Sequence, residues 1–314
     1  MKAPRCALGC TDCAIAHPLR ALVAAALMGV GMVPPLKAQT LPLSALVMPG
    51  NQEHHVGKVV WVQLFTPDLS LAKSFYGALF GWQFRDLKVG SEDYAEASLH
   101  GELVAGLMHK SVSGGERGQS RWLTFLAVRD ADATRTLALA NGARVLREPR
   151  TLLGRGREAV LQDPQGAVFA ILDSSSGDPP DEMAGPGEWI WSSVSAFNPQ
   201  ASAGFYQSLF GYEVFDLPAD AGEKHLMLAT EDYARASATN LPENQPHAQP
   251  DWMNYIHVED VAAGIVRVVS LGGRVLTEPK LDRHGGFVAI VADPLGAPFG
   301  LLEWPDLQGK GVMQ

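Results

Sequence analysis

The stretch FYGALFG at residues 75–81 decides the fold, because it returns 130 residues later as FYQSLFG at 205–211. Its surroundings return at the same offset: Trp61 recurs as Trp191, and DPQGAVF at 163–169 recurs as DPLGAPF at 293–299. A constant offset over separate blocks indicates two copies of one structural unit. One block departs from it. Asp93-Tyr94 resembles Asp232-Tyr233 at an offset of 139, which predicts a nine-residue loop insertion in the second copy.

The hydrophobic pattern of the first copy is itself doubled. A strand-like run is followed by a helix that starts at Pro67-Asp68 and ends at Gly81, and then by three strands. The same order then restarts. Each copy therefore contains two βαβββ units, and the predicted fold class is α+β. The expected strands are 58–66, 82–87, 94–99, 103–109, 122–128, 144–147, 158–162 and 167–172, and the second helix is 131–141.

Composition favours a globular chain of two domains, with 314 residues, 46% hydrophobic and 19% charged. The formal net charge of −9 argues against a nucleic-acid partner and an anionic membrane surface. The predicted organisation is a leader (1–38), a linker (39–56), a first domain (57–173), a second linker (174–186), a second domain (187–305) and a tail (306–314).

The leader has the features of a signal peptide. Basic residues precede an apolar run at 21–33, and Leu36-Lys37-Ala38 offers a cleavage site. We therefore expect an exported protein, periplasmic or secreted, with no membrane span after cleavage. An uncleaved N-terminal membrane anchor and a disordered leader are the alternatives. All three cysteines, Cys6, Cys10 and Cys13, lie in the leader, so the folded part has no disulfide and no thiolate ligand.

These motifs resemble the vicinal oxygen chelate superfamily, which includes glyoxalase I, extradiol dioxygenases such as dihydroxybiphenyl dioxygenase, and bleomycin-resistance proteins. The resemblance rests on the Phe-Tyr-x3-Phe-Gly helix, on the strand at 101–106 and on the Asp-Pro-x-Gly-Ala-x-Phe turn, and it covers nearly all of both copies. It implies paired βαβββ units whose mixed sheet curls into a cup with the helices outside. In the enzymes of the superfamily, the cup holds a divalent metal bound by His, Gln or Glu.

The positions that the resemblance assigns to metal ligands carry none of these side chains here. None of the residues found there supplies the oxygen or imidazole nitrogen that a divalent ion requires. We therefore expect no metal and no other cofactor. The resemblance implies the fold of the superfamily but not its metal-dependent reactions. The six positions are Trp61, Leu123 and Ala170 in the first copy and Trp191, Met253 and Gly300 in the second.

Strand alternation predicts which side chains line each cup. If the first tryptophan of each copy points inward, alternate residues of the two central strands share its face. The result is an apolar, aromatic pocket with a few polar groups, which suits a small planar ligand. The alternative is that the tryptophans fill the cups as core. The predicted pocket residues are Trp61, Gln63, Phe65, Leu123, Phe125, Trp191, Ser193, Met253, Tyr255 and His257.

Other candidates are weaker on sequence grounds. His257 beside Asp251 and Glu259 is a candidate general base, although a lone histidine on a strand is more often structural. The Gly-rich loops with Arg155 and Arg157, and with Arg283-His284, could clamp an anion, but solvated turns are the commoner reading. His54-His55 lies in the linker and is expected to face solvent.

Two functions follow. The first is an exported, metal-independent protein that binds a small apolar or aromatic molecule. The second is a divalent-metal enzyme, resembling lactoylglutathione lyase or an extradiol dioxygenase, with non-standard ligands drawn from His109, Glu96, Gln63, His257 and His284. A purely structural module is a third. The two domains are expected to pair within the chain, while the sequence leaves the oligomeric state and the ligand open.

Overall fold

The computed structural model describes residues 42–110, 120–218, 223–241, 248–282 and 285–304. The first copy forms one eight-stranded sheet with two helices. Its elements are β1 (Val59–Thr66), α1 (Leu69–Phe80), β2 (Gln83–Val89), β3 (Glu92–Leu99), β4 (Glu102–His109), β5 (Arg121–Ala127), α2 (Ala131–Ala140), β6 (Arg144–Leu152), β7 (Gly156–Gln162) and β8 (Val168–Ser174).

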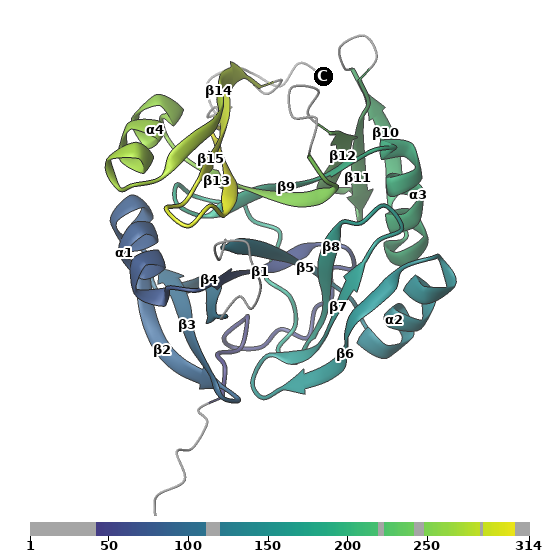
Figure 1. The fold of residues 1–314 in the computed structure, drawn as a ribbon. Helices are drawn as coiled ribbons and strands as arrows, with labels where there is room; N and C mark the ends of the chain where they lie inside the picture. The colour runs from purple at the N-terminus through teal and green to yellow at the C-terminus, as the bar shows by residue number, and fades with distance from the viewer. Residues whose placement is uncertain (1–41, 111–119, 219–222, 242–247, 283–284, 305–314) are drawn as a thin grey trace, which may run out of the picture. The chain divides into compact units, whose positions relative to one another are not determined.

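The second copy repeats this order, and the helices lie on the outer sides of the curled sheets (Figure 1). The predicted α+β fold of two tandem domains is confirmed. The elements are β9 (Trp189–Ala196), α3 (Pro199–Phe210), β10 (Glu213–Leu217), β11 (His225–Thr230), β12 (Tyr233–Asn240), β13 (Asp251–His257), α4 (Val261–Ser270), β14 (Arg274–Leu281), β15 (Phe287–Ala292) and β16 (Pro298–Leu302).

The two units of each copy join through an antiparallel pair of their first strands. The strand order is β2-β3-β4-β1-β5-β8-β7-β6 in the first sheet and β10-β11-β12-β9-β13-β16-β15-β14 in the second. Within each unit of the first copy, the first and last strands form a parallel pair, β1–β4 and β5–β8. A βαβββ unit requires this when its last strand returns beside its first. Each sheet curls so that one face is concave, and we call these two faces the first cup and the second cup (Figure 1).

The duplicated helix motif has a clear physical origin. Asp68 caps α1 by accepting a hydrogen bond from the backbone of Leu71, and Gly81 ends the helix with φ +79°. In α3 the same places are taken by Asn198 and Gly211, the latter with φ +72°. The repeat of FYGALFG is thus a repeat of a capped helix with the same buried stripe.

The predicted match of Asp93-Tyr94 with Asp232-Tyr233 is wrong. Asp232 lies in the turn of the β11–β12 hairpin and Tyr233 begins β12, which pairs in parallel with β9 just as β4 pairs with β1. The true counterpart of β3 is therefore β11, and no nine-residue insertion exists at this point. The error arose because the tripeptide Glu-Asp-Tyr occurs both at the start of β3 and at the turn that leads into β12.

The two copies pack on each other through their helices. Helix α1 lies beside α4, and α2 beside α3 (Figure 1). Tyr76 of α1 donates to Asp293 at 3.2 Å, and its oxygen accepts from the Trp122 indole at 3.1 Å. The second copy reproduces the arrangement in the equivalent group Tyr206, Asp163 and Trp252. The expected pairing of the two domains within one chain is thus present.

The linker that precedes β1 has no helix or strand, but it is not a free tether. From Leu43 onward it lies within the curve of the first sheet (Figure 1). The leader, the cysteines and the proposed cleavage site lie outside the described residues. Among the residues that are described, no helix is long and apolar enough to cross a membrane.

Candidate ligand-binding cups

The predicted lining of the first cup does share one face. In the antiparallel pair of β1 and β5, Trp61 lies opposite Phe125 and Gln63 lies opposite Leu123, and opposed residues point to the same side. These four side chains are buried, and Phe65 is half-buried. The strand alternation assigned the face correctly, but the burial shows that this cup is already full.

The chain itself fills the first cup. Leu43 packs in a cluster with Leu87, Tyr94 and Met108, and Leu46 packs against the cluster around Trp61. These contacts cover the apolar part of the face, so in the described structure the chain itself takes the place that a small molecule would need.

A buried ion pair holds this segment in place. Glu96 on β3 accepts from the backbone N–H of Ser44 at 2.8 Å, from its hydroxyl at 2.8 Å and from Arg155 at 2.9 Å. Arg155 also donates to the Ser44 carbonyl at 3.0 Å, and its guanidinium lies 3.9 Å from the Trp61 ring centroid. Arg85 adds a second cation at 2.6 Å from Glu96.

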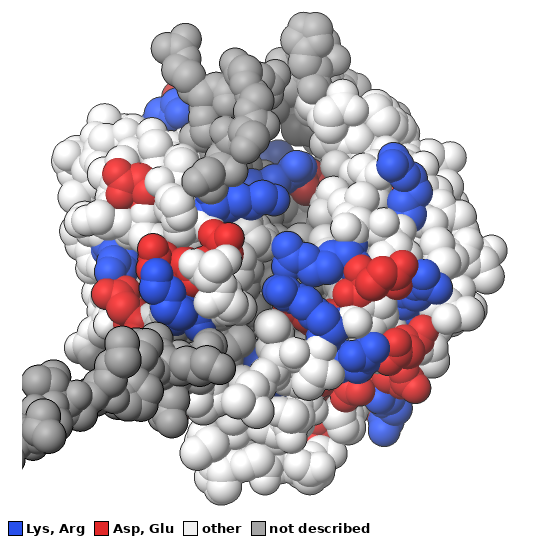
Figure 2. Space-filling model, turned by 60° about the horizontal axis from the view of Figure 1, so that its bottom comes forward, with Lys and Arg blue, Asp and Glu red and all other residues white. Residues whose placement is uncertain are grey.

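The charge state of Glu96 follows from these contacts. Burial alone would raise the pKa of this carboxyl, but the hydrogen bonds from Arg85 and from Ser44 outweigh it, and the net pKa lies below the usual value. The carboxylate is therefore ionised, and it balances Arg155, whose side chain is only 2% exposed. Sequence reasoning missed this pair and treated the loop of Arg155 as solvated, which is correct only for Arg157, paired with Asp132 on the surface. Figure 2 shows that basic and acidic side chains lie next to one another over one face of the molecule.

The second cup has the same geometry, and none of the residues that the structure describes fills it as residues 43–47 fill the first. Ser193 lies opposite Met253, and Trp191 opposite Tyr255, on β9 and β13. Apart from the buried Ser193, these side chains are half-buried rather than buried. The row continues through Ser237 and Met227 to Phe215 at the sheet edge, so an apolar strip crosses the face.

Side-chain hydroxyl groups interrupt this apolar strip. The Trp191 indole donates to Ser237 at 3.1 Å, and Ser195 shares a hydrogen bond with Thr239 at 3.4 Å. Burial raises the pKa of Tyr255 to about 12, with Asp282 adding to the shift, so its hydroxyl stays protonated at neutral pH. A hollow lined by Phe215, Met227 and their neighbours opens along β10–β12 at the end of the strip.

The metal-ligand positions of the superfamily do not fit a metal in either cup. In the first, Trp61, Phe125 and Ala170 stand side by side across β1, β5 and β8. In the second, the Tyr255 ring covers Gly300, so that a Cβ there would lie 2.0 Å from a ring carbon. Aromatic rings occupy the space at these positions, and none of the six residues there offers a side-chain oxygen or nitrogen ligand.

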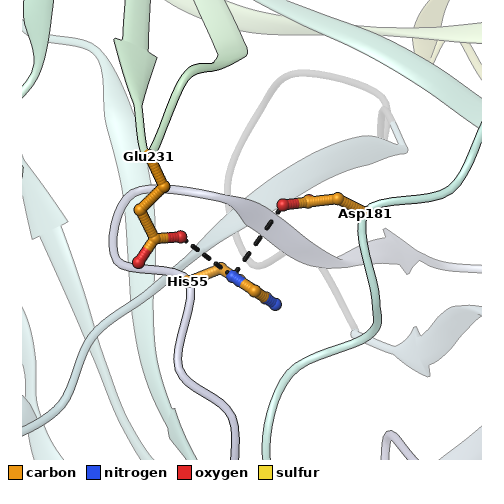
Figure 3. Close-up of side chains that lie close together, drawn as sticks. All are labelled: His55, Asp181 and Glu231. Atoms are coloured by element: carbon orange, nitrogen blue, oxygen red, sulfur yellow. Dashed lines mark hydrogen bonds and ion pairs between the residues drawn. The ribbon is translucent and has the colours of Figure 1, made fainter.

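Elsewhere among the described residues, one group consists of side chains of the kinds that bind metal ions: His55, Asp181 and Glu231 (Figure 3). His55 Nδ1 lies 2.9 Å from Glu231 and 3.8 Å from Asp181. The carboxylates are already balanced, because Lys58 lies 2.7 Å from Asp181 and Arg235 contacts both of them. The group is an ion-pair network, and a divalent ion would have to displace two cations.

This network also corrects the prediction that His54-His55 faces solvent. Both residues are half-buried, and the His55 side chain is 19% exposed. The His55 backbone N–H donates to Asp178 at 2.8 Å. The linker before β1, the linker between the domains and the β11–β12 hairpin are thus tied together here.

The remaining sequence candidates are not assembled into a site. His257 donates from Nδ1 to the Ala184 carbonyl at 2.8 Å, which is a structural role, and Asp251 pairs with Arg121 of the first domain at 2.8 Å. His109 ends β4 at the rim of the first sheet. Glu96 and Gln63 are engaged within the first cup, and Arg283-His284 lies outside the described residues.

Comparison with known proteins agrees with the architecture. Residues 58–171 match the family model described as Glyoxalase/Bleomycin resistance protein/Dioxygenase superfamily, and residues 192–302 match that of a Glyoxalase-like domain. Two solved structures share the fold. The Mn(II)-bound glyoxalase of Novosphingobium aromaticivorans has a TM-score of 0.56 at 18% identity, covering 80% of this chain and 83% of its own. Homoprotocatechuate 2,3-dioxygenase of Brevibacterium fuscum has a TM-score of 0.58 at 12% identity, covering 86% and 87%.

Two curated relatives match this chain over almost their whole length. The Mycobacterium bovis protein provisionally named glyoxylase CFP32 is 29% identical over 258 residues, covering 82% of this chain and 98% of that protein. The anthracycline biosynthesis protein DauV of Streptomyces sp. is 30% identical over 262 residues, covering 79% and 93%. The chain belongs to the glyoxalase/bleomycin resistance protein/dioxygenase superfamily and carries two of its domains in tandem.

Proposed function

We propose that this protein is exported and binds a small, planar, apolar or aromatic molecule in its second cup, without a metal. The observation that carries the proposal is the contrast between the cups. The first is closed by the protein's own chain, whereas Trp191, Met253 and Tyr255 of the second remain half-buried on an apolar face. Such a face with hydroxyls at its margin suits a flat ring system bearing a few polar substituents.

The description of one relative suggests the same class of ligand. DauV is described as an anthracycline biosynthesis protein, and anthracyclines are flat polycyclic aromatic molecules. A tryptophan and a tyrosine opposed on neighbouring strands provide ring faces against which such a molecule can stack. We therefore choose an anthracycline and smaller aromatic acids as the first probes.

The experiment is a titration of the full chain followed by intrinsic tryptophan fluorescence and by calorimetry. We expect one site per chain for at least one aromatic probe. Met253→Arg, which puts a charge on the apolar strip, should weaken binding by at least about tenfold. Val266→Arg is the matched control, because Val266 is 69% exposed on α4 and remote from the cup. Equal binding by both variants would refute the assignment to the second cup.

A metal-dependent enzyme is the competing function, favoured by the fold shared with a manganese-bound glyoxalase. Elemental analysis of the purified protein distinguishes the two. About one tightly held divalent ion per chain, lost when His257 is replaced by alanine, would overturn the metal-independent proposal. Export is tested separately, by N-terminal sequencing of the protein recovered outside the cytoplasm, where we expect a start after Ala38.

A further inference from the structure

We propose that the first cup is a peptide-binding site, which the chain fills in cis with residues 43–47. The site takes a short, apolar peptide whose backbone bends near its C-terminal end. This is a second binding activity, independent of the small-molecule site proposed for the second cup.

Two apolar side chains of the segment reach separate places on the concave face. Leu43 is 8% exposed and contacts the cluster of Leu87, Tyr94 and Met108, while Leu46 contacts the cluster of Trp61 and Leu123. Separate contacts of this kind, made by two side chains three residues apart, let a protein select the side chains of a bound peptide. Met48, two residues further on, is 81% exposed and takes no part in the apolar contacts.

The backbone between these leucines is recognised by two oppositely charged side chains. Glu96 accepts from the Ser44 N–H, and Arg155 donates to the Ser44 carbonyl. Such a pair reads one residue of an extended chain by its donor and its acceptor together. At the ends of the segment, Leu43 donates to the Leu153 carbonyl at 3.0 Å, and Val47 donates to the Ser176 hydroxyl at 3.3 Å.

The cup rim is shaped to admit this backbone. A Cβ on Gly154, which has φ +86°, would lie 2.1 Å from the Leu43 carbonyl oxygen. At this end of the segment, therefore, only glycine combines the required backbone conformation with room for the incoming chain.

Within the part of the chain that the structure describes, the recognition groups lie in the first cup. In sheet register, Arg85 and Glu96 of the first cup correspond to Phe215 and Met227 of the second. Arg155 corresponds to Gly285 by the offset that relates β7 to β15. Among the described residues, a buried ion pair directed at a backbone occurs in the first cup and not in the second, and we infer that the first cup is specialised for a peptide.

The test separates the occupant from the cup within the full chain. Leu43→Glu combined with Leu46→Glu changes only the segment, and it should expel the segment because a carboxylate cannot enter the apolar clusters. A fluorescent peptide of residues 42–51 should then bind this variant with one site per chain, at least about 100-fold more tightly than it binds the unaltered protein. Met48→Glu is the matched control, and should leave the cup closed to the peptide.

Specificity is checked with a peptide carrying Leu43→Glu, which should not bind. A natively folded double variant that binds the native peptide no better than the unaltered protein does would overturn the proposal. Hydrogen exchange on the unaltered protein gives a second measurement should the variant not fold. The Ser44 and Val47 amides should exchange at least about 100-fold more slowly than in the free peptide, and exchange at the rate of the free peptide would also overturn it.

Discussion

The buried pair of Glu96 and Arg155 permits a quantitative test of what holds the first cup closed. Glu96→Gln keeps the shape of the side chain and removes its charge. Both partners are almost fully buried, with side chains 1% and 2% exposed. The substitution leaves Arg155 without its buried counter-charge and sets an amide NH2 among four donors. Breaking such a pair typically costs about 3–5 kcal/mol.

We expect the lower end of that range, about 3 kcal/mol, because the half-exposed Arg85 can relax into solvent. With a urea m-value of about 2–3 kcal/mol/M, the unfolding midpoint should fall by about 1–1.5 M. The assay is urea unfolding followed by circular dichroism. Arg85→Gln is the matched control, since it removes a partner of the same carboxylate that is 50% exposed, and it should cost less than about 1 kcal/mol.

The same carboxylate predicts a pH dependence. Its pKa is lower in the folded protein than in the unfolded chain, so it stabilises the fold above its unfolded pKa of about 4.3. This stabilisation is lost as the pH falls through the folded pKa. Glu96→Gln should therefore flatten the acid limb of the stability profile below about pH 4. A midpoint shift under about 0.3 M, an unchanged acid limb, or an equal cost for Arg85→Gln would refute the reasoning.

Three further predictions concern packing, each read out as a change in thermal unfolding. Gly106→Ala should destabilise by about 1–3 kcal/mol, because its Cβ would lie 2.0 Å from the Tyr94 hydroxyl oxygen. Gly204→Ala in α3, where a Cβ meets no atom within 4 Å, should instead stabilise by about 0.5–1 kcal/mol. Tyr206→Phe should cost about 1–3 kcal/mol, since it leaves the buried Trp252 indole N–H without the acceptor it has at 2.9 Å; no measurable change would contradict that role.

The elements that sequence predicted well are those fixed by local chemistry. The capped helix from Asp68 to Gly81 carries its start, stripe and stop within its own sequence. The faces of β1 and β5 follow from alternation, so Trp61 and Phe125 could be placed on one side. Nothing beyond neighbouring residues had to be known for either.

The closure of the first cup could not be found in this way, because its partners are far apart in sequence. Ser44 contacts Glu96 52 residues away and Arg155 111 residues away. The segment itself has no periodicity, so a pattern-based reading describes it only as a linker. Its place is decided by tertiary contacts to a surface that exists after the sheet has formed.

One signal was nevertheless present, and a misregistered match concealed it. At the offset of 139, Glu96 is aligned with Arg235, so both copies would carry a charged residue at this position of the cup. In the register set by the strand pairing, the residue of the second copy that is equivalent to Glu96 is Met227. A carboxylate on the inner face of an apolar cup, where the sister copy has a thioether, requires a buried partner. Applied to a correctly registered repeat, that requirement would have pointed to Arg155 and to an occupant between them.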